Sequence, residues 1–160
     1  MIRVQREDFD VGAEIAALSQ GRNQIGGVAS FVGLVRDRAA GRPVGAMTLE
    51  HYPGMTERLL ADIEAEARRR WPLEDCLIVH RYGRLVPGDR IVLVITASAH
   101  REAAFAACRF LVDWLKTQAP FWKLEEGPGE EGGGQRRWVE AREADDAAAA
   151  RWTKKDDAAE

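Results

Sequence analysis

Two lysines carry the clearest signal for chemistry in this sequence. Of 23 basic residues, 19 are arginine and four are lysine, and only Lys116 and Lys123 precede the polar final segment that holds the other two lysines. An arginine keeps its proton at any working pH, whereas a desolvated lysine can release one and act as acid, base or nucleophile. These two amines therefore indicate a catalytic pair. The alternative is that they are lysines by chance and extend to solvent from a helix end.

A second group of basic residues fits an anionic ligand. His100 and Arg101 stand where a predicted strand ends and a long predicted helix begins, and a helix N-terminus offers free backbone N–H groups. Arg36 ends a glycine-rich predicted strand, although a charge cluster there is also typical of a solvated loop. Together with the two lysines, these residues predict a cationic pocket for a small anionic substrate. The alternative for His100 is a partly buried cap residue.

Other familiar sites are not indicated. The sequence contains neither a glycine-rich nucleotide-binding motif nor a nucleophile elbow. Cys76 and Cys108 lie 32 positions apart without a CxxC pair, so we expect two reduced, buried thiols and neither a zinc site nor a disulfide. His51 and His80 lack metal-ligand spacing and are interpreted as structural. The sequence therefore predicts no bound metal and no cofactor.

Hydrophobic periodicity and turn residues predict the elements that would position these residues. Helices are expected from Asp10 to Gly21, over 56–70 with Thr56 as its cap, and over 101–118 with Phe105 on the apolar face. Strands are expected over 26–36, 46–51, 76–80, 90–97, 121–125 and 138–142, with loops over 37–45, 82–89 and 127–135. Strands and helices alternate without a strict βαβ pattern. We therefore expect an α+β fold, with helices packed on a mixed or antiparallel sheet.

Composition limits the class of protein. The chain has 160 residues, a net charge of −3 and a mean hydropathy of −0.34, and no apolar run is long enough to span a membrane. The acidic balance disfavours binding to nucleic acid. We expect one cytoplasmic domain over 1–152, followed by a polar, disordered tail over 153–160. Neither a membrane nor a nucleic acid is expected as a partner.

The same residues resemble the catalytic, large subunit family of molybdopterin synthase. The similarity is carried by blocks in family order over about residues 1–152, of which LEHYPGMTE (49–57) and APFWK (119–123) are the most unusual. The other blocks are SFVGLVRD (30–37), HRYGRL (80–85) with PGD (87–89), SAHR (98–101) and WVEAR (138–142).

This resemblance implies a fold, a reaction and partners. The fold would be the single-domain α/β hammerhead type. The reaction would transfer sulfur to cyclic pyranopterin monophosphate and form the dithiolene of molybdopterin. The sulfur would arrive as a thiocarboxylate on the C-terminal Gly-Gly of a small ubiquitin-like subunit. Two large subunits would form a dimer with one small subunit at each outer end, giving a heterotetramer.

The resemblance also assigns residues to roles. Lys116 and Lys123 match the catalytic lysines of the family, and we expect Lys123 to act as acid or base and Lys116 to position the substrate and stabilise charge. His100 and Arg101 can serve the neighbouring subunit's site across the dimer. The expected substrate-binding residues are Leu34, Val35, Arg36, His100, Arg101, Lys116, Lys123, Leu124 and Glu125. Phe31 and Arg142 are expected to line the pocket or hold the partner's tail.

One segment departs from the family pattern, and one alternative function stays open. The loop over 127–136 is longer and richer in glycine than expected, which affects any lid over the pocket and the role of Arg142. The alternative function is a binding module that docks a ubiquitin-like tail without chemistry. The two lysines argue against it, because arginine would suffice to bind a carboxylate.

Overall fold

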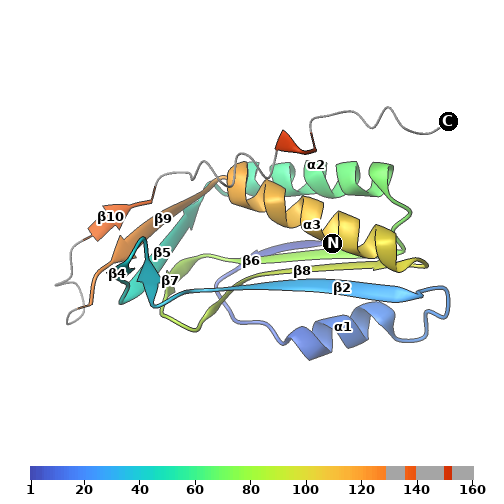
Figure 1. Cartoon of the computed structure of the whole chain (residues 1–160), viewed down its shortest axis with the longest axis horizontal. Helices are drawn as coiled ribbons and strands as arrows, with labels where there is room; N and C mark the ends of the chain where they lie inside the picture. Colours follow the sequence, from blue (N-terminus) through green and yellow to red (C-terminus); the bar gives the residue numbers. More distant parts are fainter. Residues whose placement is uncertain (129–135, 140–149, 153–160) are drawn as a thin grey trace.

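The computed structural model describes residues 1–128, 136–139 and 150–152, which form three helices and ten strands (Figure 1). The helices are α1 (Val11–Ser19), α2 (Met55–Arg70) and α3 (Arg101–Thr117). The α+β class expected from the sequence is confirmed, and the strands form two four-stranded sheets and one small hairpin.

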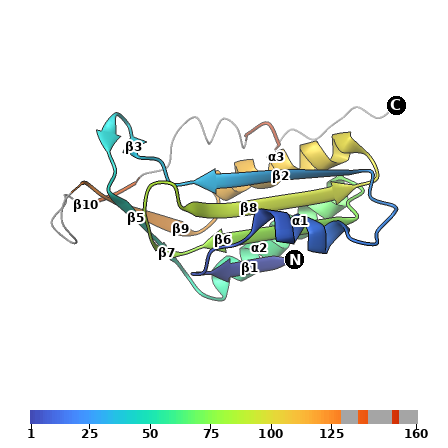
Figure 2. The same ribbon diagram turned by 90° about the horizontal axis from the view of Figure 1, so that it is seen from below.

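The first sheet is mixed and carries the helices. Its order is β1-β6-β8-β2, built from β1 (Ile2–Gln5), β6 (Asp75–Arg81), β8 (Arg90–Ser98) and β2 (Gly27–Leu34). Strand β1 runs parallel to β6, and the other neighbouring pairs are antiparallel. Helices α2 and α3 cover one face, and α1 lies across the other (Figures 1 and 2).

The second sheet is antiparallel and lies at one end of the molecule, beyond the C-terminal end of α3 (Figure 1). Its order is β10-β9-β5-β7, built from β10 (Arg136–Trp138), β9 (Phe121–Glu126), β5 (Ala46–His51) and β7 (Gly83–Leu85). Because β7 follows β6 after one residue, the two sheets meet at the edge where β6 ends.

Apolar side chains hold the layers of the first sheet together. The main core cluster lies between that sheet and helices α2 and α3, and each of its fully buried leucine, isoleucine or valine side chains contributes roughly 1.5–3 kcal/mol. Its members include Leu60, Ile63, Ile78, Val94, Ala104 and Leu111. A second cluster, with Leu18 and Leu93, fixes α1 on the opposite face. The sheet is therefore a rigid platform.

The helix starts follow local chemistry, with one correction. Asp10 caps α1 as expected, because its carboxylate accepts a hydrogen bond from the Ala13 N–H at 2.8 Å. Thr56 does not cap α2: Gly54 is the cap residue, and the Glu57 carboxylate accepts from its N–H at 2.6 Å. The buried Thr56 hydroxyl instead donates to the Tyr52 carbonyl at 3.0 Å.

Three other expectations were wrong in detail. The predicted loop over 37–45 contains a hairpin of β3 (Arg38–Ala39) and β4 (Arg42–Pro43). The predicted loop over 82–89 contains β7, and β1 was not predicted. Phe105 is 65% exposed instead of facing the core. Two-residue and three-residue strands carry too little periodic pattern to be found from sequence. Strand β7 is defined by its pairing with the distant β5, and the β3–β4 hairpin by only two residue pairs.

The C-terminal expectations are tested only in part. Strand β10 includes Trp138, the first residue of the predicted strand over 138–142. The loop residues 129–135, Arg142 and the expected tail over 153–160 lie outside the described residues. Trp152 packs against Trp71 and Phe110, with ring centroids 5.7 and 5.4 Å apart.

Candidate active site

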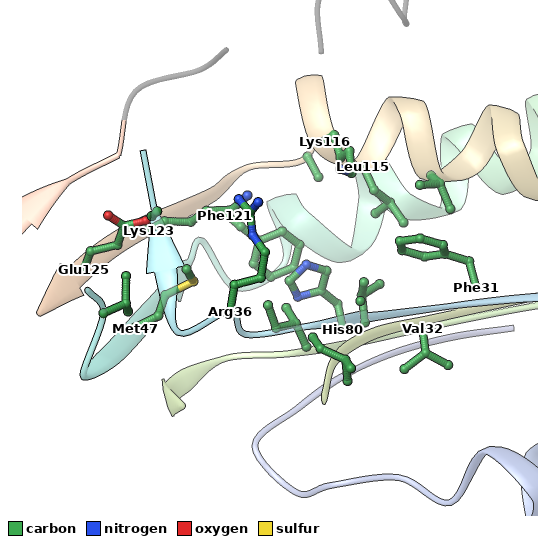
Figure 3. Close-up of a pocket in the computed structure, with 18 of the residues that line it drawn as sticks. Phe31, Val32, Arg36, Met47, His80, Leu115, Lys116, Phe121, Lys123 and Glu125 are labelled. Carbon is green, nitrogen blue, oxygen red and sulfur yellow. The ribbon is translucent and has the colours of Figure 1, made fainter. Parts of the chain in front are cut away.

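A cavity of about 550 Å³ opens where the two sheets meet the C-terminal end of α3 (Figure 3). It is lined from β2, β5, β6, β8, β9, the β3–β4 hairpin and the C-terminal part of α3. We call it the cationic cavity, because Arg36, Arg38, Lys116 and Lys123 all line it. No other arginine or lysine in the described part of the chain lines it.

Three separate segments bring the principal cations together. Arg36 follows β2, Lys116 lies in the last turn of α3, and Lys123 lies in the middle of β9. Lys116 is exposed at a helix C-terminus, where the helix dipole favours a cation, whereas Lys123 is half-buried. The structure therefore brings together these three of the residues predicted to form a pocket.

Alternation along β9 selects which of its side chains reach the cavity. Phe121, Lys123 and Glu125 line it, whereas Trp122 and Leu124 belong to the opposite face of the strand. Leu124, expected among the substrate-binding residues, thus does not line the cavity. Glu125 is buried, and its carboxylate pairs with the Arg137 guanidinium at 3.5 Å.

The end of β2 contributes consecutive residues to the cavity, whereas the residue that follows the strand turns away from it. Phe31 and Leu34 line the cavity. Val35 is 3% exposed and packs with Leu49 and Leu85 instead of lining it. The Val35 N–H donates to the Asp89 carbonyl at 2.9 Å, which fixes the backbone just before Arg36. The contribution of Val35 is thus to hold Arg36 in place.

Gly33 lets two strands approach closely beside the cavity. A Cβ at this position would lie 2.7 Å from Val92 Cγ1, a contact that real Cβ atoms essentially never make. Both residues line the cavity. The glycine therefore sets the shape of the wall between β2 and β8.

His100 and Arg101 lie elsewhere. They stand at the N-terminus of α3, about 22 Å of helix away from Lys116, and both are exposed. Neither lines the cationic cavity. Within one chain, His100 and Arg101 therefore do not lie with the other predicted pocket residues. Arg142, also predicted to act at the pocket, lies outside the described residues.

His80 is a cavity residue that sequence reasoning did not select. Its ring is 6% exposed, lines the cavity and stacks on Phe121, with centroids 3.6 Å apart and 12° between the planes. Burial, with smaller effects from the nearby Lys123 and His51, lowers the pKa of His80 to about 3. The interpretation of His80 as a structural, uncharged residue is thus incomplete. The HRYGRL block begins at His80 but assigns it no role, and its stacking partner lies 41 positions later.

The remaining nucleophiles and metal-ligand residues form no second centre in the described ranges. Cys76 and Cys108 are free and buried as expected, and burial raises their pKa values to about 12 and about 11. No three His, Cys, Asp or Glu side chains among the described residues are grouped to hold a metal ion. No helix in the same residues is long and apolar enough to cross a membrane.

Comparison with known proteins agrees with this geometry. The family model described as MoaE protein matches residues 4–118. A molybdopterin synthase catalytic subunit of Ralstonia nicotianae is 58% identical over 151 residues, covering 94% of this chain and 83% of that protein. A corresponding subunit of Pseudomonas aeruginosa is 57% identical over 154 residues, covering 94% and 97%.

Solved structures show the same fold. A molybdopterin biosynthesis MoaE protein from Burkholderia ambifaria superposes with a TM-score of 0.80 at 55% identity, covering 97% of this chain and 99% of that one. Both the family model and these relatives span most of the sequence. The chain therefore belongs to the MoaE protein family.

Proposed function

We propose that this chain is the catalytic subunit of a molybdopterin synthase and that the cationic cavity is its active site. The observation that carries this proposal is the convergence of Arg36, Lys116 and Lys123, from three separate segments, on one cavity. The reaction is sulfur transfer from the C-terminal thiocarboxylate of a small ubiquitin-like subunit to cyclic pyranopterin monophosphate. Two such transfers install the dithiolene.

The cavity chemistry suits both reactants. A phosphate group is held best by a guanidinium that can donate two parallel hydrogen bonds, and Arg36 supplies one at the cavity wall. In each transfer the thiocarboxylate sulfur bonds to a carbon of the pterin while a carbon–oxygen bond at that carbon breaks, and the oxygen leaves as water or as the phosphate oxygen of the opened ring. Water then cleaves the acyl–sulfur bond. The tail leaves as a carboxylate, and negative charge develops on the acyl oxygen. A protonated lysine stabilises that charge.

The two lysines suit different roles. Lys123 is half-buried beside His80 and Phe121, so a proton it exchanges is shielded from bulk water. We assign it the acid or base role in the thiocarboxylate attack. Lys116 is exposed at the end of α3, where the helix dipole favours its charge. We assign it substrate positioning and charge stabilisation.

Further residues complete the proposed site. Phe31, Leu34 and Glu125 line the cavity and contact the pterin or the partner's tail. His100 and Arg101 act at the pocket of a second copy, because they lie too far from the cavity of their own chain. Arg142 is proposed as a tail-binding residue from its family motif alone.

The extent of the domain and its compartment follow from packing and thiol chemistry. We place the domain boundary after Trp152, because its indole packs on Trp71 and Phe110 and donates a hydrogen bond to Asp113 at 2.9 Å. The two free thiols suit a reducing compartment, so we place the reaction in the cytoplasm.

Incubation with a thiocarboxylated small subunit and the cyclic pterin tests this function. The expected result is dithiolene product, formed in proportion to the thiocarboxylate consumed. Binding of the tail without any product would instead support a binding module. The curated names of the relatives favour the catalytic function, since they describe catalytic subunits.

A further inference from the structure

The cationic cavity is rich in hydrogen-bond donors and poor in acceptors. Arg36, Arg38, Lys116 and Lys123 are donors only. Among the nitrogen and oxygen atoms of the described lining side chains, acceptors occur only on Glu125 and His80. The Glu125 carboxylate is already paired with Arg137. That contact engages one of its two oxygens, so an incoming heterocycle with its own N–H groups has two side-chain acceptors to bind, His80 and the other oxygen of Glu125.

The tautomer of His80 is set by its neighbour. Its Nδ1 lies 2.8 Å from the Arg81 carbonyl oxygen. A carbonyl can only accept a hydrogen bond, so Nδ1 carries the ring proton. In the neutral ring, Nε2 is then a bare acceptor.

Nε2 is also open to a ligand. It makes no hydrogen bond with any residue in the described ranges, yet it is not sealed away. His51 provides the contrast, because its Nδ1 is fully buried without a described partner. In Figure 3 the His80 ring lies among the side chains of the cavity, between Arg36 and Phe31 in this view. Because His80 lines the cavity, its unpaired Nε2 is available to a ligand bound there.

The ring is held rigidly and stays uncharged. Stacking on Phe121 and the bond to Arg81 fix both its plane and its rotation. The charged side chains that line the cavity with it are the four cations and Glu125, and the half-buried His51 lies nearby. The low pKa of the ring, about 3, keeps it an acceptor over the working pH range. A protonated imidazole would only add another donor to a cavity that already has four.

We infer that His80 is a substrate-orienting residue, whose Nε2 accepts a hydrogen bond from an N–H group of the pterin heterocycle. The cations hold the phosphate at one end of the ligand, and His80 accepts a hydrogen bond from the heterocycle at the other end. This inference rests on the proposed function. It implies that the cavity distinguishes between ligands of the same charge. A ligand whose ring lacks an N–H at that point leaves Nε2 unpaired and binds more weakly.

The test compares two substitutions with the wild-type chain. His80→Phe keeps the stack on Phe121 and removes the acceptor, and we expect the dissociation constant of the cyclic pterin to rise about 3- to 10-fold. His80→Gln can return an acceptor and should bind more tightly than His80→Phe. His51→Phe is the matched control and should bind the pterin as the wild type does. Equal pterin affinity in the His80→Phe and wild-type proteins would overturn the inference.

A second measurement needs no variant of His80. In protein with ¹⁵N-labelled histidine, we expect the bare Nε2 resonance of one buried ring to shift when the pterin is added. It should not shift when inorganic phosphate is added alone. An unchanged Nε2 resonance in pterin-saturated protein overturns the inference while leaving the proposed function intact. If the wild-type chain neither binds the pterin nor yields product, the proposed function fails as well.

Discussion

Helix α3 carries basic residues at both of its ends, and the two ends have different surroundings. At the C-terminal end, Lys116 shares a cavity of about 550 Å³ with Arg36 and Lys123. At the N-terminal end, His100 and Arg101 are exposed and line no part of that cavity. The residue types at the two ends are similar, so residue type alone does not make a site.

The two ends of α3 differ because the sheets place different side chains beside them. The C-terminal end of α3 faces the junction of two sheets, so β2 and β9 each add a cation and β6 adds a neutral ring. The N-terminal end has only the first sheet below it. Under the proposed function, the C-terminal end serves the pocket of its own chain, whereas the N-terminal end is proposed to act at the pocket of a second copy.

The largest effect should come from removing the half-buried amine of Lys123, in the cavity beside the C-terminal end of α3. Lys123→Ala should lower the single-turnover rate of dithiolene formation about 10²- to 10⁴-fold, because general acid–base catalysis is lost. Lys116→Ala should lower it less, about 10- to 100-fold. A Lys123→Ala rate within a few-fold of the wild-type rate would remove Lys123 from the chemistry.

Arg36 should act on binding more than on rate. Arg36→Ala should raise KM for the cyclic pterin about 10- to 100-fold with a smaller change in kcat, because a charge-assisted contact to phosphate is lost. Arg42→Ala is the matched control, since Arg42 is an exposed arginine of the same hairpin region that does not line the cavity. Equal KM values for the two variants would argue against a phosphate site at Arg36.

Complementation tests whether the N-terminal end serves a second copy. Arg101→Ala and Lys123→Ala chains, each impaired alone, are co-expressed with different tags. With random pairing, half of the dimers are mixed, and one of the two pockets in each mixed dimer is complete. About a quarter of the wild-type rate should therefore return. If Arg101 serves its own chain, no pocket is complete and the rate should not recover.

The pH dependence of stability should show the smallest effect. The pKa of His80 falls from an ordinary value of 6.5 to about 3 in the folded chain. Below pH 6.5 the His80 imidazole is protonated in the unfolded chain but stays neutral in the folded chain, so stability falls as the pH drops towards 3. At pH 5 the free energy of unfolding is lower by about 2 kcal/mol for this reason.

The His80→Gln variant should lack this acid-induced loss, as measured by urea unfolding at pH 7 and pH 5. Identical pH slopes for the two proteins would contradict a neutral, buried His80.

Much of the fold and half of the site could be predicted from sequence because the signals are local. The 46–51 strand and the 101–118 helix have clear periodicity, and the excess of arginine over lysine singles out Lys116 and Lys123. His80 and the short strand β7 could not be predicted in this way. Their surroundings are set by contacts between β6 and β9 and between β7 and β5.

The order of residues along a strand also limits what a motif can assign. Val35 and Leu124 stand next to Arg36 and Lys123 in the sequence, yet neither lines the cavity. Alternation sends Leu124 to the opposite face of β9, and burial takes Val35 into a small core cluster. A contiguous motif therefore marks where a site lies, and only the fold shows which of its side chains reach it.

The central claim is that lysine amines, and not merely positive charge, carry out sulfur transfer in the cationic cavity. The most direct measurement is the single-turnover rate of dithiolene formation in Lys116→Arg and Lys123→Arg variants, given the thiocarboxylated small subunit and the cyclic pterin. Arginine keeps the charge but cannot exchange a proton. We predict that both variants still bind the tail and the pterin, and that Lys123→Arg loses at least about 100-fold in rate. Wild-type rates in both variants would contradict the account.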